Sequence, residues 1–112
     1  MTVGAWLRSR TPPPPPAMLA GVIDALGDRT ALGAHAAPMA CLDAAVALLE
    51  ALLREDTLGR ERADELLVAD ALVTYAFEAA ATSASDLDEF AAMVMTRLAG
   101  LSSAESDGRT RE

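Results

Sequence analysis

The most constraining feature of this sequence is the segment 60–81, which contains neither glycine nor proline. Most of its residues are strong helix formers, and acidic side chains near its start suit the positive end of a helix dipole. On a helical wheel its apolar residues cover an arc of roughly 200°, wider than the stripe of a simple surface helix. Such a helix must be covered on two sides. We therefore expect the rest of the chain to pack around it.

Length and composition limit what can form this cover. A chain of 112 residues is the size of one domain with a single modest core. Hydrophobic residues make up 52% of the chain but aromatic residues only 4%, so the core must consist of leucine, valine, methionine and alanine. Small domains with thin cores often gain stability by oligomerising.

Helical periodicity recurs along the chain, and we place helices at residues 16–26, 38–54, 60–81 and 86–100. The link between the second and third helices, residues 55–59, is so short that these two helices must be antiparallel neighbours. The sequence predicts an all-α fold, a small antiparallel four-helix bundle with an extended proline-rich N-terminal arm. We expect the arm at 1–16, the bundle at 17–101 and a disordered polar tail at 102–112.

Several helix ends carry recognisable signals. Gly27 follows the first helix in the position where a left-handed residue commonly ends a helix. Pro38 suits the first turn of the second helix. Ser85 with Asp88 resembles a capping box, and Gly100 marks the expected end of the last helix. The residues between Gly27 and Pro38 are predicted to form a surface loop.

The N-terminal segment contains the only tryptophan, Trp6, and two interpretations stay open. Trp6 folds back onto the bundle in a short turn, or it inserts into a partner or a membrane interface. The run Pro12–Pro16 predicts an extended polyproline helix, a stiff spacer. Together Arg10, Pro13 and Pro16 also match the spacing that proline-binding domains of the Src-homology type recognise.

Charge and cysteine content exclude several classes of function. The net charge of −8 disfavours a nucleic-acid partner, because binding phosphates requires clustered basic residues. Cys41 is the only cysteine and His35 the only histidine, so no internal disulfide forms and most transition-metal sites are excluded. The chain lacks a secretory signal and an uninterrupted apolar run of about 18 residues, which predicts a cytoplasmic protein without a membrane-spanning helix.

Catalytic motifs are missing from the sequence. It contains no glycine-rich phosphate loop, no calcium loop and no glutamate–histidine pair of the di-iron type. Cys41 lies at the apolar edge of its helix, where a thiol is typically a small core residue rather than a nucleophile. We therefore predict no catalytic residue, no metal and no cofactor.

One polar strip allows a functional interpretation. Asp70, Thr74 and Glu78 are spaced by four residues on the helix 60–81 and share one face. This face is either solvated or lines a groove in which Asp70 and Glu78 anchor a basic partner residue or a ligand amine. Leu72 and Tyr75 lie on the apolar arc, where helices of this chain or of a second copy must cover them.

These observations favour a non-catalytic helical interaction protein, an adaptor or accessory subunit that binds a protein partner or itself as a homodimer. The alternative is a small helical enzyme or ligand-binding bundle with an acidic and tyrosine site on the helix 60–81. A further alternative is a peripheral membrane protein that binds through the Trp6 arm. The candidate partner-binding residues are Trp6, Pro13, Pro16, Asp70, Leu72, Tyr75 and Glu78.

Overall fold

The computed structural model describes residues 1–55, 59–82 and 86–110, and of residues 102–110 the backbone alone. These residues are mostly helical and form no strand, apart from an isolated bridge between Thr2 and Gly33. The prediction of an all-α fold is confirmed. The α-helices of the described residues are α1 (Val3–Arg8), α2 (Pro16–Leu26), α3 (Ala37–Arg54), α4 (Arg60–Thr82) and α5 (Leu87–Thr110).

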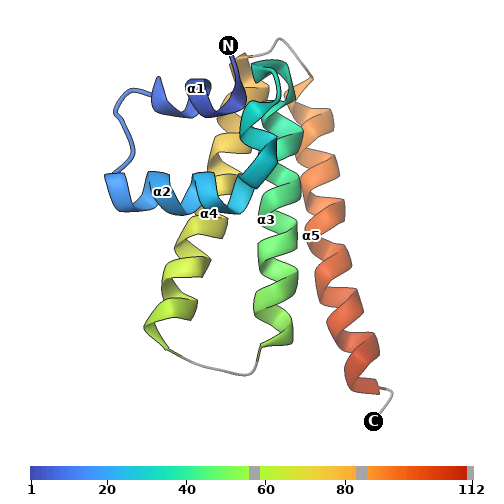
Figure 1. The fold of residues 1–112 in the computed structure, drawn as a ribbon. Helices are drawn as coiled ribbons and strands as arrows, with labels where there is room; N and C mark the ends of the chain where they lie inside the picture. The colour runs from blue at the N-terminus through green and yellow to red at the C-terminus, as the bar shows by residue number, and fades with distance from the viewer. Residues whose placement is uncertain (56–58, 83–85, 111–112) are drawn as a thin grey trace.

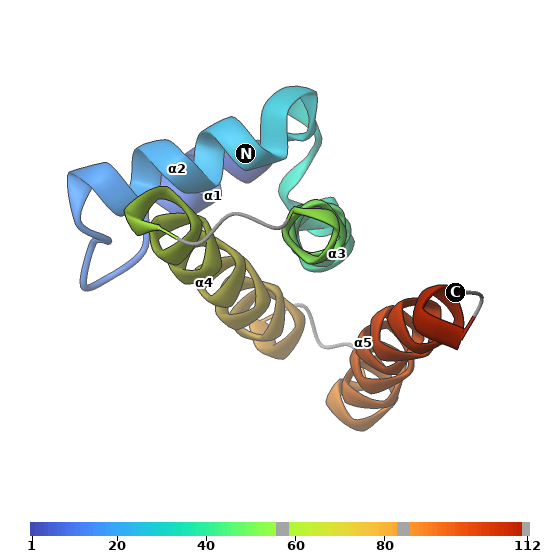
Figure 2. The same cartoon turned by 90° about the horizontal axis from the view of Figure 1, so that it is seen from below.

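The arrangement differs from the predicted four-helix bundle. Helices α3, α4 and α5 run alongside one another, while the short helices α1 and α2 lie across them on one side (Figure 1). The view from below shows α2 passing beside α4, with α5 on the far side of α3 (Figure 2). Two 3-10 turns, Gly27–Ala31 and Ala34–Ala36, connect α2 to α3 where the sequence predicted a loop.

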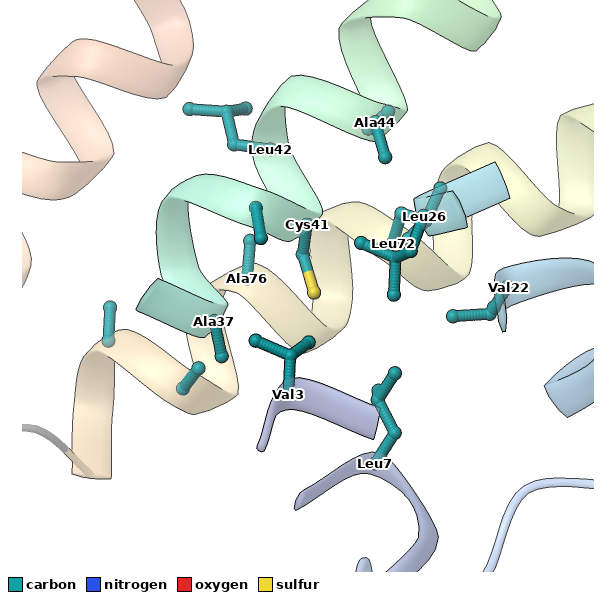
Figure 3. Close-up of a cluster of buried hydrophobic side chains, with 14 of the residues drawn as sticks. Val3, Leu7, Val22, Leu26, Ala37, Cys41, Leu42, Ala44, Leu72 and Ala76 are labelled. Carbon is teal, nitrogen blue, oxygen red and sulfur yellow. The ribbon is translucent and has the colours of Figure 1, made fainter. Parts of the chain in front are cut away.

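Helices α3 and α4 are antiparallel neighbours, as the short link predicted. This pair forms the centre of the molecule. The buried side chains of this pair are mostly small, which lets the two backbones approach closely. They include Ala37, Ala40, Ala44 and Ala45 on α3, and Ala69, Ala76, Ala79 and Ala80 on α4. Larger side chains from α1 and α2 complete the core. Figure 3 shows Leu72 next to Leu26 and near Val22, with Val3 and Leu7 approaching the same cluster.

Helix α4 is covered on two sides by this same chain. On one side α2 comes so close that a Cβ added at Gly21 would lie 2.7 Å from Cγ2 of Val68. On the other side Phe77 meets Phe90 of α5 edge to face, with ring centroids 5.4 Å apart. Leu72, which comes between Val68 and Phe77 in the sequence of α4, is fully buried. The wide apolar arc of α4 is therefore covered largely by other helices of the same chain.

The N-terminal segment is not a simple extended arm. Thr2 caps helix α1 by accepting a hydrogen bond from the backbone N–H of Ala5 at 3.1 Å. Val3 and Leu7 of this helix are fully buried, and the Val3 N–H donates to the Leu32 carbonyl at 2.8 Å. Between α1 and α2, residues 13–15 of the proline run are in neither helix nor turn, and Pro16 already begins α2. Because a six-residue helix has a single i, i+4 apolar pair, periodicity alone did not identify it.

The predicted helix ends agree with the structure at α2 and differ at α5. Helix α2 ends at Leu26, and Gly27 has a positive φ of 55°, which glycine adopts easily, with a ψ of −127° rather than the left-handed helical value. Helix α5 continues to Thr110, whereas the sequence placed its end at Gly100 and a disordered tail at 102–112. A glycine inside a helix costs only about 1 kcal/mol, so it does not force an end.

The start of α5 has a different cap from the predicted one. Ser85, the expected capping residue, lies outside the described residues. Asp86 accepts hydrogen bonds from the backbone N–H groups of Asp88 at 3.0 Å and Glu89 at 3.2 Å. These bonds satisfy two of the donors that a helix leaves unpaired at its N-terminus. The segment Asp86–Glu89 therefore supplies its own cap.

Within the described residues one helical segment is long and apolar enough to cross a membrane, Ala34–Arg54, with a mean hydropathy of 1.8. The sequence analysis required an uninterrupted apolar run and found none, because Asp43 and Glu50 interrupt this segment. The segment contains α3, which contributes much of the core, and the central helix of a folded domain has the same composition. Cytoplasmic localisation stays a prediction.

Candidate functional site

Three parts of the chain meet beside α4 in a cluster of aromatic and charged side chains. Trp6 of α1 meets Tyr75 of α4 edge to face, with ring centroids 6.3 Å apart. The guanidinium carbon of Arg10 lies 4.6 Å from the centroid of the Trp6 ring, a cation–π contact. Nη2 of Arg10 pairs with Oε2 of Glu78 at 3.2 Å. The cluster fastens the segment after α1 onto α4.

The Arg10–Glu78 ion pair is partly exposed and incompletely satisfied. The two side chains are 25% and 42% exposed, so water screens their attraction, and such a pair contributes at most about 1 kcal/mol. Nε of Arg10 is buried and has no hydrogen-bond partner. A buried N–H without a partner costs about 1–3 kcal/mol. Arg10 therefore fixes the direction of the chain more than it stabilises the fold.

Tyr75 stays protonated in this environment. Burial raises the pKa of its phenol, the nearby Glu78 carboxylate raises it further, and the Arg10 guanidinium opposes the change. Burial also raises the pKa of the Cys41 thiol to about 12. Both groups are therefore neutral near pH 7, and neither has the activated, ionised form that a nucleophile or a general base requires.

A small pocket lies between the proline run and α4, with a volume of about 320 Å³. The prolines supply ring faces and carbonyl acceptors but no N–H donors. Helix α4 lines the pocket with Ala71, Thr74, Tyr75 and Glu78, and the Thr74 hydroxyl donates to the Asp70 carbonyl at 3.1 Å. We call this site the proline pocket. Its lining residues are Arg10, Thr11, Pro12, Pro13, Pro14, Pro15, Ala71, Thr74, Tyr75 and Glu78.

The predicted site residues divide between this cluster and other places. Trp6, Pro13, Tyr75 and Glu78 belong to the cluster or the pocket. Leu72 is fully buried in the core and is not presented to a partner. Asp70 and Pro16 are exposed and do not line the pocket, so the strip of three polar residues on α4 contributes only Thr74 and Glu78.

Arg10 is the residue whose role the sequence analysis missed. We considered a basic partner residue opposite Glu78, and the structure places this chain's own Arg10 there. The spacing of Arg10, Pro13 and Pro16 also loses its regular polyproline geometry. Pro16 is the first residue of α2 and therefore belongs to a helix, while Arg10 is engaged with Trp6 and Glu78. No local signal indicates this pairing, because 68 residues separate the two charges.

A second site, which the sequence analysis did not identify, lies between α3 and α5. Helix α5 is held near its start by the buried residues Phe90 and Val94 and by Arg97, which donates to Oδ1 of Asp43 at 3.0 Å. Farther along, a groove of about 670 Å³ separates the two helices. We call it the α3–α5 groove. Its lining residues are Val46, Glu50, Leu53, Arg54, Thr96, Arg97, Gly100 and Leu101.

Among the described residues, no group of three or more histidine, cysteine, aspartate or glutamate side chains could hold a metal ion. The comparisons with known proteins add no functional information: no family model, curated protein or solved structure matches this chain.

Proposed function

We propose that this chain is a non-catalytic helical interaction protein that associates with itself, most simply as a homodimer. The observation that carries the proposal is the α3–α5 groove, where Leu53 of α3 is 41% exposed in an apolar channel. Other large apolar side chains are exposed on the long helices, among them Leu66, Leu67, Leu87 and Met95. Burying such surface is the dominant driving force of protein association.

The neutral state of Cys41 and Tyr75 supports the non-catalytic part of the proposal. Neither side chain is activated, and the arginine nearest Tyr75 is already paired with Glu78. A self-associating accessory subunit needs only a stable fold and an exposed apolar surface.

Sedimentation velocity from low to high micromolar concentration tests the proposal. We expect the weight-average mass to rise from that of one chain toward that of two, because mass action favours the dimer as concentration increases. A single monomeric species up to several hundred micromolar would remove self-association and leave a different protein as the only possible partner.

The proline pocket favours a second candidate function, the binding of a small cationic ligand. Its proline wall offers acceptors only, and Glu78 uses one oxygen for Arg10, so an ammonium group finds acceptors there. Trp6, the only tryptophan, stacks on Arg10 and reports on any displacement. We expect butylamine or putrescine to change Trp6 emission in a saturable way, and Glu78→Gln to abolish the change. Glu61→Gln, at an exposed site in the first turn of α4, is the control.

The membrane alternative depends on the same tryptophan. Arg10 covers the Trp6 ring and Tyr75 meets it, so insertion into a bilayer must break both contacts. Liposome flotation of the wild type and Trp6→Ala distinguishes this alternative, since it requires flotation of the wild type alone.

A further inference from the structure

The α3–α5 groove has the shape of a socket for one apolar side chain. Val46, nearly buried, and Leu101 form part of its lining, and the exposed Leu53 stands beside them. The wall of the groove that α5 forms has small residues, because Thr96 has a short side chain and Gly100 has none. A Cβ added at Gly100 would meet no atom within 4 Å. Among the side chains that the structure describes, the groove therefore has room at Gly100 for a side chain from outside.

The rim of this groove carries two exposed charges of opposite sign. Glu50 and Arg54 both line the groove, and neither makes an ion pair with a side chain that the structure describes, although their spacing on α3 permits one. Arg97 at the upper end is different, because Asp43 already neutralises it. The groove thus offers one acid, one base and one protruding leucine on a single helix face.

Glu50, Leu53 and Arg54 can pair with the same residues of a second copy that is related by a twofold rotation. Two copies of α3 placed antiparallel, with the axis level with residue 52, bring Glu50 of each copy opposite Arg54 of the other. Glu50 and Arg54 are each two residues from residue 52. The Glu50–Arg54 pair therefore forms twice, once on each side of the axis. Leu53 lines the groove one residue from this level, so in this arrangement it lies close to the axis and beside the groove of the other copy. An unrelated partner would have to supply all three groups itself.

We infer that the α3–α5 groove is the interface of a twofold symmetric homodimer, in which Leu53 of each copy fills the groove of the other and Glu50 pairs with Arg54 across the axis. This inference rests on the proposed self-association and adds its location and geometry. Helix α5 then has a function in the assembly, since Thr96 and Gly100 form part of one wall of each groove.

The first experiment compares two leucines by sedimentation equilibrium. Leu53→Gln removes the apolar group from the groove, whereas Leu67→Gln changes a leucine of α4 that is more exposed, 55% against 41%, and does not line the groove. Because each dimer loses two partly buried leucines, we expect Leu53→Gln to raise the dimer dissociation constant on the order of tenfold. Leu67→Gln is expected to change it less than twofold. Equal effects of the two variants would overturn the groove as the interface while self-association stands.

The second experiment tests the antiparallel geometry by exchanging charges. Glu50→Arg alone places two arginines opposite each other at both rim positions, and Arg54→Glu alone places two glutamates there. We expect each single variant to weaken the dimer several-fold at low salt, and the double variant E50R/R54E to recover wild-type affinity. Circular dichroism melts of each variant confirm that the monomer fold is kept. A double variant as weak as the singles would overturn the twofold pairing, and a monomeric wild type would overturn both this inference and the proposed function.

Discussion

Gly21 is the position where a small substitution tests the packing of the whole N-terminal half. It lies inside α2, where alanine would normally be preferred over glycine by about 0.5–1 kcal/mol. A Cβ at this position, however, would lie 2.7 Å from Cγ2 of Val68 on α4, closer than non-bonded carbon atoms can approach. Val68 is β-branched and has one strongly preferred rotamer in a helix, so it cannot turn away cheaply. Gly21→Ala therefore sets helix propensity against overpacking.

The magnitudes favour overpacking. Inserting a methyl group into a packed contact typically costs about 1–3 kcal/mol, which exceeds the propensity gain, so we expect Gly21→Ala to destabilise the fold by about 1 kcal/mol. Val68→Ala removes two methyl groups that are half-buried, at a cost of about 0.8 kcal/mol. In the double variant the clash disappears and the propensity gain remains, so its stability should return close to that of the wild type. The coupling energy between the two sites is then about 2 kcal/mol.

Urea denaturation followed by circular dichroism at 222 nm measures these differences. Gly100→Ala is the matched control, because Gly100 lies inside α5 and a Cβ there meets nothing within 4 Å. Because Gly100 also lines the α3–α5 groove, all variants are compared at a concentration where the chain is monomeric. We expect this control to stabilise the protein by about 0.5–1 kcal/mol. If Gly21→Ala stabilises the protein as much as Gly100→Ala does, α2 does not approach α4 as closely as described, and the reasoning is refuted.

Three further predictions follow from the core and the cluster. The folded state keeps the Cys41 thiol protonated up to a pKa of about 12, whereas the thiol of the unfolded chain ionises near pH 9. The free energy of unfolding should therefore fall by about 1.4 kcal/mol per pH unit above pH 9. Urea titrations of Cys41→Ala should show a shallower fall. Phe90→Ala should cost about 3 kcal/mol and speed amide hydrogen exchange in α5 while exchange in α3 stays slow, since Phe90 anchors α5 on Phe77. Arg10→Ala should lower stability by no more than about 1 kcal/mol and shift Trp6 emission to longer wavelength, and an unchanged spectrum would contradict the stacking.

Some elements were predictable because their causes are local. The link 55–59 is too short for anything but a hairpin of α3 and α4, and Gly27 ends α2 through its own backbone freedom. Helix α1 was missed because a six-residue helix shows one apolar pair, although Thr2 at its start was a readable cap signal. The end of α5 was misplaced because a single glycine weakens a helix without ending it.

The candidate sites depended on contacts that no local pattern contains. The polar strip on α4 drew attention to Glu78, and the structure pairs Glu78 with Arg10 of the same chain. A polyproline segment makes no internal hydrogen bonds, so its sequence does not reveal which helix it will lie against. That Leu53 is apolar can be read from the sequence, whereas its 41% exposure depends on the tertiary structure.

By itself the sequence determined that this chain is helical, where most of its helices begin, and that α4 must be covered on two sides. These properties follow from backbone hydrogen bonds and side-chain periodicity within a few residues. Only the tertiary structure decided that α1 and α2 cover one side of α4, that Arg10 meets Glu78, and that α5 leaves the groove beside Leu53 open. The reason is geometric: the angle at which two helices cross depends on all the side chains between them, and small differences in that angle close a surface or leave it exposed.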